Sequence, residues 1–357
     1  MPAIRIPSPF PAAWRMTSPA GTSQSTRWHT TRTGVWWTCS TAGKTWSRAC
    51  SAAWGTRPAV SKEDALRILR GLRFASQLGF SIEEATGAAL WEEKGRLQTL
   101  SHERVREELT KLLCGENAAP VLREYAGILF TLLPELAPMK GCAQETPYHC
   151  FDVWEHTLHA LEHAPAGAAL RWAALLHDTG KPARKTFSPD GVAHFYGHPP
   201  ESGRVARRVL TRLRFSKREA EWIASLVDHH EDPMPMGEKA LKRLLGQHGE
   251  AFVFTLFQLQ EADLSAKAPG VFQRRLPDLE GSRARARAIL ERGDCLTLGD
   301  LALSGEDLKA LGIPPGPEMG SLLRRLLDAV QEGGVPNQAA ALERLALCLW
   351  REEGYKK

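Results

Sequence analysis

The sequence predicts a mainly α-helical protein, and three observations support this prediction. Apolar residues recur at helical spacing through most of the chain after residue 60, beginning with the segment 66–78. Only residues 187–198 show the two short alternating runs around a turn that are typical of a β-hairpin. Stretches rich in Pro and Gly, such as 137–147, separate the periodic segments as linkers do.

The composition is that of an ordinary globular chain. The 357 residues exceed a typical single domain, and the chain is 43% hydrophobic and 24% charged. The formal net charge of +5 is compatible with a polyanionic partner but does not require one. The seven Cys residues include no CxxC pair, and no apolar run approaches the roughly 20 residues of a membrane span. We therefore expect a cytoplasmic protein.

Residues 1–60 differ from the rest of the chain. They contain no Asp, Glu or Leu, yet they hold six of the 11 Trp residues. No helical or strand period runs through them. Many Ser, Thr, Gly and Pro residues usually indicate disorder, but disordered segments are poor in Trp. We therefore expect an irregular segment that fits neither a folded domain nor a linker.

A third interpretation of residues 1–60 is translation in a shifted reading frame. Trp and Met each have one codon, so some junctions can be translated in the shifted frame without choosing codons. Met16-Thr17 must then give Asp, and Trp54-Gly55 must give Gly. The segment is predicted to be either disordered or an out-of-frame remnant.

The first regular segment begins near Ser61, which resembles a helix N-cap. Its apolar stripe is formed by Leu66, Leu69, Phe74 and Leu78. A second face is expected from residues that recur every third position, namely Asp64, Arg67, Arg70 and Arg73. Carboxylate and guanidinium groups can hydrogen-bond base edges, and Arg can also bind phosphates. The alternative is a solvated Arg-rich face, as most such stripes are. Further helices are expected at 101–113 and 127–136.

A His and an Asp stand side by side in the middle of the chain. The apolar run 173–176 leads into His177 and Asp178, and a Gly-Lys-Pro triplet then breaks the helix. Imidazole and carboxylate together suit a divalent ion such as Mn, Fe, Zn or Mg. Neighbours on a helix diverge, so the pair needs partners from other helices of a bundle. The chain offers His156, His198, His229, His230 and Asp263. The alternative is a set of polar residues satisfied in the core or left on the surface.

The last part of the chain returns to helices. Residues 270–292 are charged and helical, and amphipathic helices are expected at 320–330 and 338–351. Between them, 296–317 contains two turns with Gly and Pro. Such turns fit helix-hairpin contacts with nucleic acid, but they also fit a helical packing unit. The pattern does not separate these two interpretations.

The ordered set of His, His-Asp and Asp resembles the HD metal-dependent phosphohydrolase superfamily. The resemblance implies that His156, His177, Asp178 and Asp263 bind the metal. Two-metal members have extra ligands, which match His198 and one of His229 or His230; His230 is preferred because Pro233 follows at the family's spacing.

The same resemblance implies hydrolysis of phosphoesters. The ion, expected to be Mn, Ni, Fe or Mg, would acidify a water and polarise a phosphoryl oxygen. Lys181 is expected to act in catalysis by neutralising phosphate charge.

The segment 63–80 resembles a second family, the bacterial CCA-adding tRNA nucleotidyltransferases and poly(A) polymerases of class II. The family's nucleotide-selecting motif Glu-Asp-x-x-Arg is matched by Glu63, Asp64 and Arg67. The resemblance implies that this helix templates CTP and ATP, with Arg70 and Arg73 helping to hold the nucleotide.

Several bacterial members of this family carry an HD domain at the corresponding place, and their tail contacts tRNA. The implied organisation is a remnant of the nucleotidyltransferase head at 1–60, a helical neck at 61–136, a linker at 137–147, an HD metal-binding domain at 148–268 and a tRNA-binding helical tail at 269–357.

The family's polymerase chemistry needs a pair of Mg-holding carboxylates on a β-sheet head. No acidic residue precedes Glu63. We therefore expect a member of the family of tRNA CCA addition and repair that, as written, does not transfer nucleotides and retains an HD phosphohydrolase domain. The alternatives are a stand-alone HD phosphohydrolase acting on nucleotides or cyclic phosphate ends, and an inactive tRNA-binding remnant. The expected partners are tRNA and nucleotides.

Overall fold

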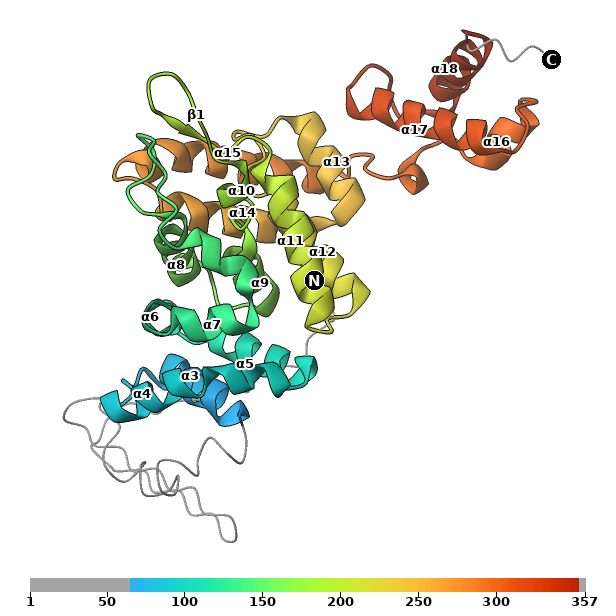
Figure 1. The fold of residues 1–357 in the computed structure, drawn as a ribbon. Coiled ribbons are helices and arrows are strands. Elements are labelled where there is room, and N and C mark those ends of the chain that lie inside the picture. Colours follow the sequence, from blue (N-terminus) through green and yellow to red (C-terminus); the bar gives the residue numbers. More distant parts are fainter. Residues whose placement is uncertain (1–64, 353–357) are drawn as a thin grey trace, which may run out of the picture.

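The computed structural model describes residues 65–352, and within them the predicted mainly helical fold is confirmed (Figure 1). The predictions for 1–60 and for Ser61, Glu63 and Asp64 lie outside the described residues. No helix in the described range is both long enough and apolar enough to cross a membrane.

The first helices follow the predicted pattern, with two differences. The helix expected at 127–136 ends at Leu132, before a separate 3-10 helix at Pro134–Met139, and the apolar stripe is only partly buried. Leu66 and Leu69 are buried, but Phe74 is only half-buried and Leu78 is 50% exposed. Gly79, at φ +68°, ends the helix in a left-handed conformation that suits glycine. The elements of this part are α3 (Leu66–Leu78), α4 (Glu84–Glu92), η1 (Lys94–Thr99), α5 (His102–Leu113), α6 (Ala118–Glu124), α7 (Ala126–Leu132) and η2 (Pro134–Met139).

The middle of the chain forms a helical bundle that surrounds the predicted metal site. Helix α14 packs against α8 and α9, and α12 packs against α9 and α11. The side chain of Asp152 caps α8 by accepting a hydrogen bond from the Glu155 N–H at 2.7 Å. The helices of this part are α8 (Val153–His163), α9 (Ala168–Leu176), α10 (Lys181–Arg184), α11 (His198–Arg212), α12 (Lys217–Asp228), α13 (Glu238–His248), α14 (Glu250–Ser265) and α15 (Val271–Arg292).

The predicted hairpin is present as two short antiparallel strands, β1 (Thr186–Phe187) and β2 (Ala193–His194). Thr186 pairs with His194, and Phe187 pairs with Ala193. The hairpin loop projects from the bundle in Figure 1, and β2 leads directly into α11.

The buried apolar side chains form two clusters. The larger cluster runs from Leu66 to Ile289 and joins the first helices to the bundle. The smaller one, from Cys295 to Ala346, lies in the last helices, which stand apart from the bundle in Figure 1. These last elements are η3 (Leu298–Asp300), α16 (Gly305–Ala310), α17 (Pro317–Gln331) and α18 (Ala339–Glu352). Because the first cluster has no break near residue 140, the neck and the bundle are one packed body.

Candidate metal centre

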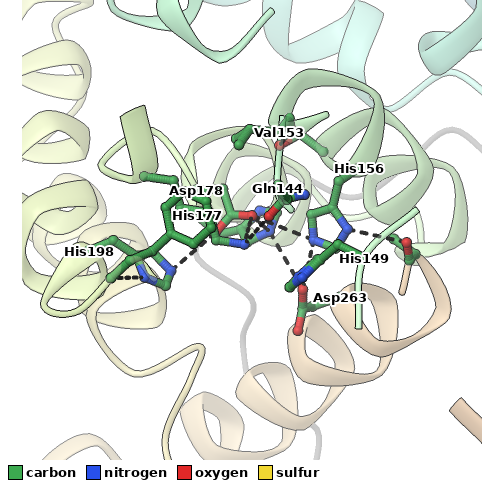
Figure 2. Close-up of polar contacts among 12 residues, drawn as sticks. Gln144, His149, Val153, His156, His177, Asp178, His198 and Asp263 are labelled. Atoms are coloured by element: carbon green, nitrogen blue, oxygen red, sulfur yellow. Dashed lines mark hydrogen bonds and ion pairs between the residues drawn. The ribbon is translucent and has the colours of Figure 1, made fainter. Parts of the chain in front are cut away.

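The predicted ligands meet inside the bundle, although they come from five different places in the chain (Figure 2). All six are buried, with exposed fractions between 0 and 5%. They are His156 on α8, His177 and Asp178 after the last turn of α9, His198 at the start of α11, His230 just after α12 and Asp263 on α14.

Asp178 stands at the centre of two groups of possible ligands. One group consists of His156, His177 and Asp178, and the other of Asp178, His198 and His230. Asp178 Oδ2 lies 3.2 Å from His177 Nε2 and 3.5 Å from His156 Nε2. On the other side, Asp178 Oδ1 lies 3.2 Å from His198 Nε2 and 3.6 Å from His230 Nε2. The carboxylate is therefore placed to bridge two neighbouring positions.

Asp263 completes the first group. Its Oδ1 lies 2.9 Å from His156 Nε2 and 3.8 Å from His177 Nε2. His177 and Asp178 approach each other although neighbours within a helix diverge by about 100°. Since His177 keeps helical backbone angles, the reach of the two side chains brings Nε2 and Oδ2 together just after α9 ends at Leu176.

Backbone carbonyls orient all four imidazole rings in the same way. In each ring Nδ1 lies 2.7 to 3.2 Å from a backbone carbonyl oxygen. The pairs are His156 with Ala266 O, His177 with Ala174 O, His198 with Phe195 O and His230 with Val227 O. A carbonyl can only accept, so Nδ1 carries the proton and Nε2 presents a lone pair to the cluster. This is the arrangement by which proteins prepare histidine as a metal ligand.

The cluster brings lone pairs together without enough protons between them. His177 Nε2 and Asp178 Oδ1 are buried and have no hydrogen-bond partner among the described residues, and Asp178 Oδ2 has an ion pair with Lys181 but no proton from the histidines. His198 Nε2 and His230 Nε2 lie only 3.2 Å apart. Buried polar atoms are normally satisfied, so such a group is explained by a cation that the lone pairs would coordinate. The donor set of imidazole and carboxylate fits a divalent transition metal.

Two lysines, the buried Lys181 and the half-buried Lys267, balance the carboxylates. Lys181 Nζ lies 2.7 Å from Asp178 Oδ2 and donates to Gln144 Oε1 at 2.9 Å. Lys267 Nζ lies 2.9 Å from Asp263 Oδ2. Burial would raise the pKa of Asp178, but the neighbouring His177 and Lys181 hold it well below its usual value. Burial likewise opposes ionisation of Asp263, and Lys267 keeps the pKa of this carboxyl low. Both carboxylates therefore remain charged at neutral pH.

The structure separates the two adjacent histidines. His230 points into the cluster, whereas His229 Nδ1 lies 2.7 Å from Asp232 Oδ2 on the outer side. Three further residues at the site were not predicted: Gln144, His149 and Lys267. Lys267 follows Asp263 by four residues on α14, and this spacing could have indicated an ion pair. Gln144 and His149 carried no comparable signal, because the segment around them has no period.

The sequence predicted that Arg67, Arg70 and Arg73 line one face of α3, but the structure arranges them differently. A spacing of three residues falls about 60° short of a full turn at each step, so the row winds around the helix. The Arg70 side chain is 48% exposed, but that of Arg73 is 14% exposed and lies against α5. There Arg73 Nη1 pairs with Glu108 Oε2 at 3.0 Å, and Arg70 Nε approaches Oε1 of the same residue at 3.8 Å. Arg73 therefore holds α3 to α5.

Two family models match parts of the chain. Residues 79–140 match the model described as a probable RNA and SrmB-binding site of polymerase A, and residues 201–346 match putative domain 2 of tRNA nucleotidyltransferase. The CC-adding tRNA nucleotidyltransferase of Thermus thermophilus is 39% identical over 309 residues, which cover 81% of this chain and 67% of that protein.

Two more comparisons agree. The A-adding tRNA nucleotidyltransferase of Deinococcus radiodurans is 33% identical over 308 residues, which cover 82% of this chain and 69% of that protein. Among solved structures, the Bacillus stearothermophilus CCA-adding enzyme in complex with CTP has a similar fold, with a TM-score of 0.61 at 22% identity. The similarity covers 87% of this chain and 67% of that one.

Proposed function

Because this chain belongs to the family of CCA-adding tRNA nucleotidyltransferases, we propose that it binds tRNA and acts on it through its buried metal centre as a phosphohydrolase. The observation that carries the proposal is the pair of unpartnered acceptors, His177 Nε2 and Asp178 Oδ1, inside the histidine cluster. A structural core would not gather them, because each unsatisfied buried acceptor costs about 1–3 kcal/mol.

The ligands of the proposed centre are His156, His177, Asp178 and Asp263, with His198 and His230 holding a second ion. A bound divalent ion, Mn, Ni, Fe or Mg, would acidify a water and polarise a phosphoryl oxygen. The chain's own residues prepare the site. The backbone carbonyls keep the Nε2 lone pairs inward, and burial in the bundle excludes bulk water.

Lys181 has a positioning role in this proposal in addition to the predicted catalytic one. Its ammonium is 2% exposed and lies between Asp178 and Gln144, so it fixes the orientation of the bridging carboxylate. Its third N–H is the one that remains for a phosphoryl oxygen, as an ammonium has three donors.

The proposal assigns nucleotide recognition to the start of α3. Arg67 is half-buried and Arg70 is exposed on this helix, while Glu63 and Asp64 precede it in the sequence. That this chain uses CTP, ATP and Mg is inferred from the family alone. Helices α16–α18 are the proposed contact with tRNA, within the part matched by the tRNA nucleotidyltransferase model.

We propose further that this polypeptide does not transfer nucleotides. Nucleotidyl transfer needs a pair of acidic ligands for Mg, and residues 1–62 contain no acidic residue. Incubation with labelled CTP and ATP and a tRNA that lacks its 3′ terminus should give no incorporation. Turnover in this assay would refute this part of the proposal and support the parent activity of CCA addition.

Hydrolysis is tested with the purified protein loaded with Mn, Ni or Mg and supplied with bis-p-nitrophenyl phosphate and nucleoside 2′,3′-cyclic phosphates. His177→Ala and Asp178→Ala should each abolish turnover. His159→Ala is the control, because His159 lies on α8 with the ligand His156 but pairs with Glu162 and stacks on Phe151. Hydrolysis that survives both ligand substitutions would show that the metal site is assigned wrongly.

A further inference from the structure

His149 lies beside the metal centre but belongs to neither group of ligands. It is part of the segment between η2 and α8, and its ring meets that of His156 edge to face at 5.3 Å (Figure 2). Its Nε2 is buried and has no hydrogen-bond partner among the described residues. Buried polar atoms normally have a hydrogen-bond partner. An atom without one is explained either by a structural defect or by a ligand that binds there.

The hydroxyl of Thr146 lies beside His149 Nδ1. Its oxygen accepts the backbone N–H of Tyr148 at 3.4 Å and lies 2.8 Å from His149 Nδ1. The hydroxyl has one proton of its own, which it can donate to Nδ1. In this arrangement the proton of the neutral ring is on Nε2, and it is the arrangement on which the inference rests.

The surroundings of His149 favour a neutral ring and an anionic partner. Burial lowers the pKa of His149 to about 3, and the positive charge of Lys181 lowers it further. Two ammonium groups, those of Lys181 and Lys267, act electrostatically on this ring, and the carboxylate of Asp263 opposes them. The two ammonium groups favour an anionic partner for Nε2.

We propose that His149 Nε2–H donates a hydrogen bond to a non-bridging oxygen of a phosphoryl group bound at the metal centre. This inference rests on the proposed phosphohydrolase function and adds to it an oxyanion subsite on the α8 side of the cluster. Preorganised donors of this kind stabilise the charge that develops on phosphoryl oxygens. His149 would thus touch the substrate without holding the metal.

The test compares His149→Phe with His149→Gln in the full chain loaded with Mn. Phenylalanine retains an aromatic ring and removes the donor, whereas glutamine retains an N–H donor. Thr146→Val is a second perturbation, because it removes the hydroxyl that keeps the proton on Nε2. His159→Phe is the control, as His159 lies on the same side of the bundle with its own partner, Glu162.

Three quantities are measured: bound Mn by elemental analysis, the KM and kcat for bis-p-nitrophenyl phosphate, and the Kd of inorganic phosphate. A hydrogen bond to a charged group predicts that the Kd of phosphate and the KM rise roughly tenfold or more in His149→Phe. Mn content should stay unchanged, His149→Gln should recover part of the loss, and Thr146→Val should shift both values in the same direction.

Each other outcome overturns a specific statement. Loss of Mn from His149→Phe would make His149 a metal ligand and refute the oxyanion subsite. An unchanged Kd and KM in both His149→Phe and Thr146→Val, with active wild-type protein, would refute the subsite and leave the proposed function standing. A wild-type protein that neither binds phosphate nor hydrolyses the ester would refute the proposed function, and the subsite with it.

Discussion

Addition of a divalent ion should raise the thermal stability of this protein, and Asp178→Asn should abolish that effect. Asp178 is the ligand shared by both groups, and its Oδ1 is a buried acceptor without a hydrogen-bond partner among the described residues. An ion that binds only the folded state stabilises it by about 2.7 kcal/mol at a concentration of 100 times its Kd. For a chain of this size, that corresponds to an increase in Tm of roughly 5 °C.

The assay is differential scanning calorimetry of chelator-treated protein with and without Mn. Wild-type protein should show the increase, and Asp178→Asn should not, because an amide oxygen replaces the charged ligand. His229→Ala is the control: it changes the residue next to His230, but His229 pairs outside the cluster with Asp232. It should retain the full increase in Tm.

Metal stoichiometry separates one ion from two. His198→Ala removes a ligand of the second group only, so it should reduce bound Mn without eliminating it. If wild-type protein shows no increase in Tm at millimolar Mn, or if Asp178→Asn shows the same increase, the argument from unpaired lone pairs is wrong.

Three substitutions test the scaffold around the centre. Glu135→Gln should lower the free energy of unfolding by about 1 kcal/mol at pH 7, because Arg212 donates to both oxygens of Glu135 at 2.5 and 2.8 Å. Burial raises the pKa of Glu135, but Arg212 lowers it below 4.5, so the difference should vanish as the pH falls through the folded-state pKa in a urea titration at several pH values. Glu108→Ala should cost about 3 kcal/mol in the same assay, because it leaves the guanidinium of Arg73 buried without its partner. Gly180→Ala should weaken Mn binding in calorimetric titrations, since a Cβ there would lie 2.6 and 2.7 Å from backbone atoms at the start of α11.

Helix positions and ligand types could be predicted because both depend on local sequence. The charged segment 270–292 was expected to be helical, and α15 spans Val271–Arg292. The turn at Asp190-Gly191 predicted the hairpin, which the structure contains. The candidate ligands were found because His and Asp residues at the metal centre differ in type from the apolar residues that otherwise fill a core.

The residues that support the ligands could not be predicted in this way. Gln144 meets Lys181, which is 37 residues further along the chain, and the segment that carries it has the composition of a linker. Glu108 is one of several acidic residues on an amphipathic helix, and only the packing of α3 on α5 buries it. The partner of each residue is set by tertiary contacts, which leave no period in the sequence.

Several ligands of the site lie at helix ends. His177 and Asp178 follow α9, His198 begins α11 and His230 follows α12. His177 keeps helical backbone angles, φ −57° and ψ −37°, so its approach to Asp178, 3.2 Å between Nε2 and Oδ2, comes from the reach of the two side chains. The same ends supply carbonyls such as Ala174 O and Val227 O, which lie in the last helical turn and accept from Nδ1. The ends of these helices therefore place the ligands and supply the hydrogen bonds that orient their rings.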